Sequence, residues 1–178
     1  MIKDILNTMT QDDFENQKFI LNLNNFLGMA MLKTYAGGGM EVNSKEEGFR
    51  ELEYKDGDFY YKDSFGGHRQ SWGREVVWYK DKPVWSQLYG GGMEKKYQND
   101  KKFTHETFDF LKKAMSAGEK KEMFQPRGPT EYIEGDWKYE ARWTGNIERF
   151  LGHEDILYKS EVVFTHDFFG GFYRSKLE

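Results

Sequence analysis

The spacing of apolar residues in the first part of the chain predicts an amphipathic helix over residues 12–32. Leu23, Phe26, Leu27 and Ala30 recur at intervals of three and four residues. This period places all of them on one face of an α-helix. We therefore expect a helix here with one apolar side.

A second pattern of the same period lies near the middle of the chain. Phe108, Leu111 and Met115 fall on one helical face. Thr104 is positioned to cap the first turn with its hydroxyl group, and Gly118 is positioned to end the helix. We predict a helix that begins at Thr104 and ends before Gly118.

The stretches that follow the two helices alternate between aromatic and polar residues. The rings that lie two or four positions apart are Phe59, Tyr61 and Phe65 in the first stretch, and Trp137, Tyr139 and Trp143 in the second. A period of two places the rings on one face of a strand. Asp56-Gly57 and Glu134-Gly135 precede the stretches and are typical of tight hairpin turns. The pattern therefore predicts antiparallel strands joined by short turns.

The chain also repeats itself in order. Residues 53–61 read EYKDGDFYY, and residues 131–139 read EYIEGDWKY. Further matches follow at a spacing of 78 residues, which one inserted residue then shifts to 79, and both series end in neighbouring glycines, at residues 91–92 and 170–171. Matches in this order along both stretches indicate an internal duplication.

These patterns predict a single α+β domain over residues 1–178. It contains two internally repeated units, each a helix followed by an antiparallel meander, at about residues 24–93 and 104–173, with a polar linker over 94–103. Units of this size are only marginally stable alone, because small domains bury a smaller fraction of their surface. We therefore expect the two units to share one twisted antiparallel sheet or a partial barrel.

Composition narrows the classes of function. The 178 residues include 26 Lys and Arg, 30 Asp and Glu, and no Cys. The absence of Cys excludes disulfides, thiolate nucleophiles and Cys-ligated metal sites. A formal net charge of −4 gives no overall attraction to nucleic acid. No apolar run approaches the length of a membrane span, so we expect no membrane partner, and nucleic acid is not the expected partner.

Several short stretches resemble a known family. They are residues 32–39 (LKTYAGGG), 73–78 (GREVVW), 82–85 (KPVW) and 127–129 (RGP). Together they resemble an uncharacterised bacterial family, a domain of unknown function, over about residues 24–173. In that family the domain occurs alone or behind an Xre-type helix-turn-helix. The resemblance implies a bacterial cytoplasmic protein with a regulatory or ligand-sensing role, and it brings no established activity.

Glu75 and Glu154 are the most informative polar residues. Each shares its strand face with apolar neighbours, while His153 and Asp155 on the opposite face are expected to meet solvent. A buried carboxylate needs a partner or a shifted pKa. The pair could grip a ligand between the repeats. Alternatively, each could accept hydrogen bonds from tyrosine hydroxyls or backbone amides and stabilise its own repeat.

Aromatic side chains could line the same pocket. The candidates, beside Glu75 and Glu154, are Tyr61, Tyr139, Trp72, Trp85 and Trp143. A flat or apolar ligand would bind among such rings. The alternative is that these rings form the core, because aliphatic residues are few.

The sequence predicts no metal site, no cofactor and no catalytic residue. His153-Glu154 and His166-Asp167 could meet across a hairpin. However, alternation places His153 and Glu154 on opposite faces, where they do not chelate one ion easily. The glycine clusters match no phosphate-binding motif, and sharp bends or bulges account for them.

Our leading hypothesis is a non-catalytic module that binds a small molecule or regulates, with an aromatic pocket between the repeats. A second hypothesis is a protein-interaction scaffold that uses an exposed Trp78 and the sheet edges. A third is a hydrolase that uses the paired glutamates Glu75 and Glu154. The third has least support, because the sequence contains no nucleophile elbow and no Ser/His/Asp spacing.

Overall fold

The structure is a computed structural model that describes residues 11–44, 46–118 and 124–174. Its helices are α2 (Gln11–Lys33), the short 3-10 helix η1 (Lys95–Tyr97) and α3 (Lys101–Ser116). Its first four strands are β1 (Arg50–Asp56), β2 (Phe59–Gly67), β3 (Gln70–Tyr79) and β4 (Lys82–Met93). The other four are β5 (Glu131–Glu134), β6 (Trp137–Asn146), β7 (Arg149–Tyr158) and β8 (Glu161–Phe172).

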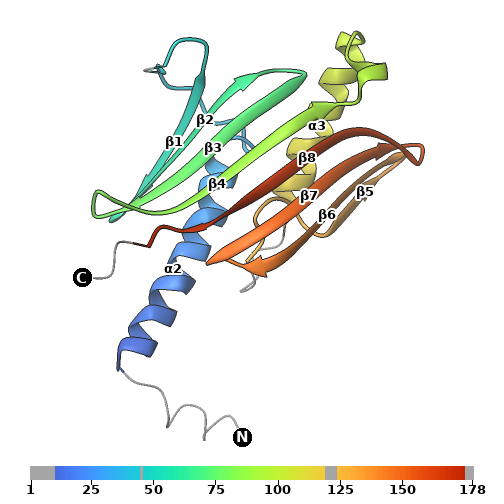
Figure 1. Ribbon diagram of the computed structural model, residues 1–178. Helices are drawn as coiled ribbons and strands as arrows, with labels where there is room; N and C mark the ends of the chain where they lie inside the picture. The colour runs from blue at the N-terminus through green and yellow to red at the C-terminus, as the bar shows by residue number, and fades with distance from the viewer. Residues whose placement is uncertain (1–10, 45, 119–123, 175–178) are drawn as a thin grey trace, which may run out of the picture.

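The eight strands form one open antiparallel sheet in the order β1-β2-β3-β4-β8-β7-β6-β5 (Figure 1). Each long helix precedes one four-stranded meander, and the meanders join where β4 pairs with β8. The α+β class is confirmed. Of the two predicted architectures, a twisted antiparallel sheet and a partial barrel, the structure has the open sheet. The duplication of the sequence stays a prediction.

Both long helices pack on the same face of the sheet (Figure 1). We call this the inner face. Buried α2 residues such as Leu23 and Phe26 contact the first meander at Val77. Buried α3 residues such as Leu111 contact the second meander at Ile156. The core therefore forms two adjoining clusters, one beneath each helix.

The α3 helix begins earlier than Thr104. Asp100 is its N-cap, and the Asp100 side chain accepts a hydrogen bond of 2.9 Å from the Phe103 amide. Thr104 lies inside the helix, and its hydroxyl donates to the Asp100 carbonyl at 2.7 Å. The predicted cap was wrong because Asp and Thr are both good caps, and the apolar pattern alone does not separate them.

The hairpin turns follow the prediction at two places and differ at two others. Gly57 and Gly135 have φ values of 55° and 62°, as tight turns require. The β3–β4 turn, however, places Lys80 and Asp81 at φ 48° and 64°. Residues 159–160 adopt the same conformation between β7 and β8. These turns lack glycine, so no turn dipeptide marks them.

The junction between the two meanders is rich in glycine. Gly91 of β4 lies opposite His166 of β8, with a φ of 139°. A Cβ atom at Gly91 would lie 2.3 Å from the Thr165 carbonyl oxygen. Glycine is therefore required here, because the two backbones approach too closely for a side chain.

Within the described residues, no helix combines the length and apolar character that a bilayer span requires.

Candidate functional site

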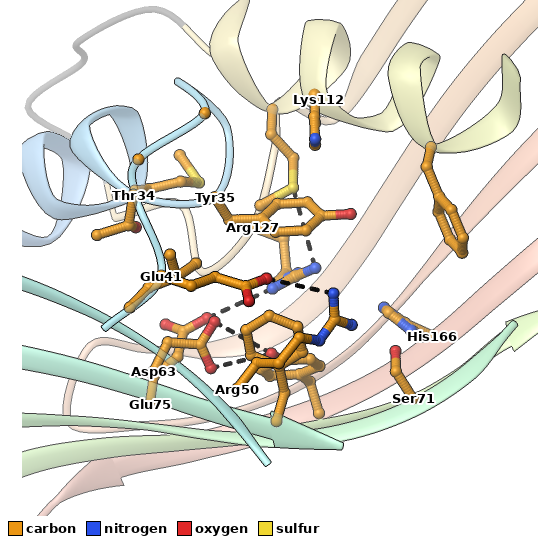
Figure 2. Close-up of a pocket in the computed structure, with 18 of the residues that line it drawn as sticks. Thr34, Tyr35, Glu41, Arg50, Asp63, Ser71, Glu75, Lys112, Arg127 and His166 are labelled. Atoms are coloured by element: carbon orange, nitrogen blue, oxygen red, sulfur yellow. Dashed lines mark hydrogen bonds and ion pairs between the residues drawn. The ribbon is translucent and has the colours of Figure 1, made fainter. Parts of the chain in front are cut away.

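A cavity of about 300 Å³ opens between the inner face of the first meander and the two helices (Figure 2). Its walls come from the end of α2 and the turn after it, from β1–β4, and from α3. The loop before β5 and strand β8 each contribute one charged or titratable side chain, Arg127 and His166. The cavity therefore lies where both halves of the chain meet, and its lining is rich in polar groups.

Two carboxyl groups form the floor of the cavity. Asp63 of β2 and Glu75 of β3 are direct neighbours in the strand register, on the inner face (Figure 2). Asp63 accepts a hydrogen bond from the Tyr89 hydroxyl, at 2.9 Å to Oδ1. Strand alternation directs both carboxyl groups inward, because Tyr61 and Val77 share their face.

The surroundings of these carboxyl groups favour their protonated forms. Burial raises the pKa of Asp63 from its ordinary value of 3.8 to about 7. Burial, followed by repulsion from Asp63, raises the pKa of Glu75 from 4.5 to about 8. At neutral pH the pair therefore holds protons that isolated carboxyl groups would have lost.

Arg127 connects Glu75 with Glu154. Its Nε and Nη2 each lie 3.0 Å from Glu154 Oε1, and its Nη1 lies 3.4 Å from Glu75 Oε1. The guanidinium group also lies over the Tyr89 ring, 4.8 Å from the centroid. The two predicted glutamates, one from each meander, thus meet through a buried arginine.

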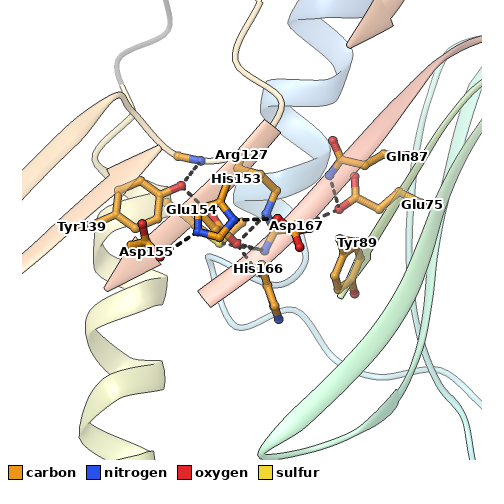
Figure 3. A network of polar contacts seen from close by, with 12 residues as sticks. Glu75, Gln87, Tyr89, Arg127, Tyr139, His153, Glu154, Asp155, His166 and Asp167 are labelled. Carbon is orange, nitrogen blue, oxygen red and sulfur yellow. Dashed lines mark hydrogen bonds and ion pairs between the residues drawn. The ribbon is translucent and has the colours of Figure 1, made fainter. Parts of the chain in front are cut away.

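Glu154 is an ionised group inside the protein, with an exposed fraction of 0%. Tyr139 donates a hydrogen bond of 2.6 Å to Glu154 Oε2 (Figure 3). Burial alone would raise the pKa of Glu154, but Arg127, His166 and Tyr139 together lower it to about 2. Glu154 therefore accepts a hydrogen bond from a tyrosine hydroxyl, as in the alternative that gives each glutamate a stabilising role.

His166 brings an unpartnered nitrogen to the cavity. Its Nδ1 lies 3.1 Å from Glu154 Oε1, and only 4% of the residue is exposed (Figure 3). Burial lowers the pKa of His166, which favours the neutral ring. Because ionised Glu154 can only accept, Nδ1 carries the proton and Nε2 is left as an acceptor. Nε2 has no hydrogen-bond partner among the residues that the structure describes.

Of the residues predicted to bind a ligand, Glu75 and Tyr61 line the cavity. Glu154 and Tyr139 do not line it, and they hold Arg127 and the loop in place behind it. The Tyr139 hydroxyl also accepts a hydrogen bond of 3.0 Å from the Gly128 amide. These two residues thus position the site and leave direct contact to others.

The three predicted tryptophans lie outside the cavity. Trp85 is buried in the core and donates to the Ile147 carbonyl at 3.0 Å. Trp143 is half-buried and packs against both core clusters. Trp72 lies on the outer face, opposite the helices, with an exposed fraction of 67%. The expectation that Trp72 faces the interior was wrong, because its neighbour Gly73 takes the inward position.

Of the predicted arrangement of His153-Glu154 and His166-Asp167, the outer face carries His153 and Asp167. His153 Nδ1 lies 2.6 Å from Asp167 Oδ1, and His153 Nε2 lies 2.8 Å from Asp155 Oδ1. Asp155 is buried, contrary to the expectation that it meets solvent, because His153 and Arg142 both contact it. The described residues contain no cluster of three or more acidic or histidine side chains able to hold a metal ion.

Sequence reasoning did not place Asp63, His166 and Arg127 in the cavity. Asp63 and His166 occupy inward positions within their aromatic alternations, between Tyr61 and Phe65 and between Phe164 and Phe168. That pattern could have identified both. Arg127 lies in a loop, where no periodicity predicts the direction of a side chain.

A comparison with protein families gives one match. The model described as "Domain of unknown function (DUF5680)" matches residues 63–173. The matched segment includes the carboxyl pair, Arg127 and His166. No curated protein and no solved structure matches the chain significantly.

Proposed function

The chain belongs to the DUF5680 family, and we propose that its function is to bind a small polar molecule in the cavity between the sheet and the helices. The binding is regulatory and not catalytic. The cavity volume of about 300 Å³ suits a small ligand. Its lining combines a carboxyl pair, an arginine and several tyrosines, which offers both donors and acceptors.

The observation that carries this proposal is the free Nε2 atom of His166. A buried acceptor without a partner costs roughly 1–3 kcal/mol. The neighbouring polar groups, Glu154 and Arg127, already bond to one another. A ligand N–H or O–H group would satisfy Nε2 and recover this free energy.

The duplication of the sequence is consistent with this proposal. In our interpretation each repeat contributes one glutamate, Glu75 or Glu154, and Arg127 binds both. A ligand beside Glu75 would then influence contacts of both halves of the sheet. The hydrolase hypothesis is not adopted, because Glu154 does not line the cavity.

Native mass spectrometry of the freshly purified protein tests the proposal. We expect a bound small molecule in the wild type and its loss in His166→Phe, which removes the free acceptor. His153→Phe is the matched control, because His153 lies on the outer face. A wild type without any bound molecule, together with no thermal shift in a metabolite screen, would contradict the proposal.

A second candidate function is self-association through the outer face. Leu88, Phe169 and Leu151 are exposed and lie in one row across β4, β8 and β7. An exposed apolar strip favours an interface, and a second copy offers the same strip.

Light scattering after size-exclusion chromatography tests this self-association. We expect a dimer that the substitution Phe169→Glu dissociates. The control substitution Leu21→Glu, at an exposed position of α2, is expected to leave the dimer intact. A monomeric wild type would exclude it.

A further inference from the structure

Resting on the proposed binding function, we propose that the ligand is a small organic cation, bound through an ammonium or related N–H group by Asp63, Glu75 and His166. Three features of the cavity carry this inference: its balance of buried charge, its free acceptor and its aromatic walls.

The buried groups contain more acid than base. Asp63 and Glu154 are buried acids, the Glu75 side chain is only 12% exposed, and Arg127 is a buried base that contacts both glutamates. Arg127 makes two contacts of 3.0 Å with Glu154 and one longer contact of 3.4 Å with Glu75. Its charge is therefore largely matched by Glu154, and the Asp63–Glu75 pair has no full counter-charge of its own.

The charged groups nearer the mouth are matched among themselves. Arg50 lies 3.3 Å from Glu41 and donates to the Gly67 carbonyl at 3.0 Å. His105 lies 3.5 Å from Asp109 on α3.

Two further groups complete the mouth. Lys112 lies over the Tyr35 ring, 5.6 Å from its centroid. His68 lies against Phe108, with ring centroids 5.3 Å apart. Neither contact involves Asp63 or Glu75, and among the described residues the pair has one ion-pair contact, the 3.4 Å contact of Glu75 with Arg127.

Protons compensate the carboxyl pair, because the pKa values of Asp63 and Glu75 are raised to about 7 and about 8. A bound cation would take over that role. An opposite charge at hydrogen-bond distance lowers the pKa of a carboxyl group. Binding would therefore release protons at neutral pH.

The other walls suit the same ligand class. His166 Nε2 needs a donor, which an ammonium group supplies and a carboxylate does not. Arg50 and Arg127 already lie over the rings of Phe65 and Tyr89. Tyr61 also lines the cavity, and a ring of this kind attracts a cation through its face. A metal ion is less suited, because the described part of the chain holds no cluster of three or more acidic or histidine ligands.

Isothermal titration calorimetry with matched probes tests the inference. The cationic probes are benzylamine, phenethylamine and putrescine, and the neutral counterparts are benzyl alcohol, phenethyl alcohol and 1,4-butanediol. At pH 7.5 we expect at least one amine to bind at least tenfold more tightly than its alcohol. Its apparent enthalpy is expected to change between buffers of different ionisation enthalpy, by an amount that shows proton release.

Variants locate the effect. Asp63→Asn and Glu75→Gln keep the shape of the side chains, and we expect each to weaken amine binding about tenfold or more and to reduce proton release. Glu51→Gln is the control, because Glu51 is a buried carboxylate on the outer face, bound to Lys62. The buffer dependence of the wild type tests the inference even where a variant does not fold.

The outcomes separate the two proposals. Equal binding of amines and alcohols, or amine binding without proton release, would overturn the cationic ligand and leave a binding cavity. A neutral or anionic molecule found by native mass spectrometry would do the same. If no amine binds, no molecule co-purifies and the metabolite screen gives no thermal shift, both proposals are wrong.

Discussion

At the scale of single residues, Arg127 has the largest energetic consequence. It is buried and holds a fully buried carboxylate, Glu154. A buried ion pair adds little net stability compared with apolar residues, but removing one partner leaves an unpaired charge inside the protein. The stability of the fold therefore depends on both partners being present together.

We predict that Arg127→Met lowers the free energy of unfolding by about 3–5 kcal/mol, because Glu154 stays buried without its counter-ion. The double variant Arg127→Met/Glu154→Gln is expected to recover part of this loss. Urea denaturation measures both. Arg142→Met is the control, because Arg142 is largely exposed and its pair with Asp155 is worth at most about 1 kcal/mol. Equal losses for Arg127 and Arg142 would contradict the prediction.

Asp63 gives a prediction for pH. Its pKa is raised from 3.8 to about 7, so between these values the folded protein keeps a proton that the unfolded chain releases. This contribution to stability is complete below pH 4 and is lost as the pH rises to 7. We expect the stability of Asp63→Asn relative to wild type to increase by roughly 2–3 kcal/mol between pH 5 and pH 8, since one pKa unit corresponds to about 1.4 kcal/mol.

Urea denaturation at pH 5 and pH 8 measures this difference. Glu75→Gln is expected to change in the same direction, because the pKa of Glu75 is raised to about 8. The same stability difference at both pH values would show that Asp63 is ionised in the folded state.

At the scale of elements, local patterns predicted most of what the structure contains. Residues 12–32 form a helix as expected, and the turns at Gly57 and Gly135 follow their dipeptides. Apolar period and turn glycines are local signals, and they sufficed for these elements. The cap of α3 and the turns at residues 80–81 and 159–160 were missed, because residues of several types can fill such positions.

The missed turns suggest a stabilising change. Lys80 and Asp81 both have positive φ, a conformation that costs ordinary residues free energy. We predict that Lys80→Asn/Asp81→Gly raises the free energy of unfolding by about 1 kcal/mol, because Asn-Gly suits this turn type. The reverse change, Gly57→Ala, is expected to lower it by about 1 kcal/mol. Thermal and urea unfolding measure both, and a loss of stability in the Asn-Gly variant would contradict the argument.

At the scale of the whole molecule, sequence patterns left more undetermined. The alternation of residues around Glu75 and Glu154 correctly predicted that both side chains point to the inner face. It did not predict which strands pair across the middle of the sheet. The β4–β8 pairing joins segments far apart in the sequence. The position of Arg127 depends on that pairing, since it contacts strands of both meanders. No local signal contains this information.

The β4–β8 junction gives a prediction at this scale. Gly91→Ala would place a methyl group 2.3 Å from a backbone oxygen and force an unfavourable φ. We expect a loss of roughly 2–4 kcal/mol, in the range of backbone strain and overpacking. Gly66→Ala is the control, because its Cβ would meet Phe49 at an ordinary 3.6 Å. Urea denaturation measures both, and equal effects would show that the junction can widen.

The same pairing has a consequence during synthesis on the ribosome. Strand β4 is made early, yet its partner β8 is the last strand in chain order. Until residues 161–172 emerge, the nascent chain exposes β4 as an open edge, which another polypeptide could join. Gly91 and Gly92, at φ 139° and 148°, hold that edge in a backbone shape that ordinary strands do not match. We expect the glycines that make room for β8 in the folded sheet also to discourage such pairing before β8 is made.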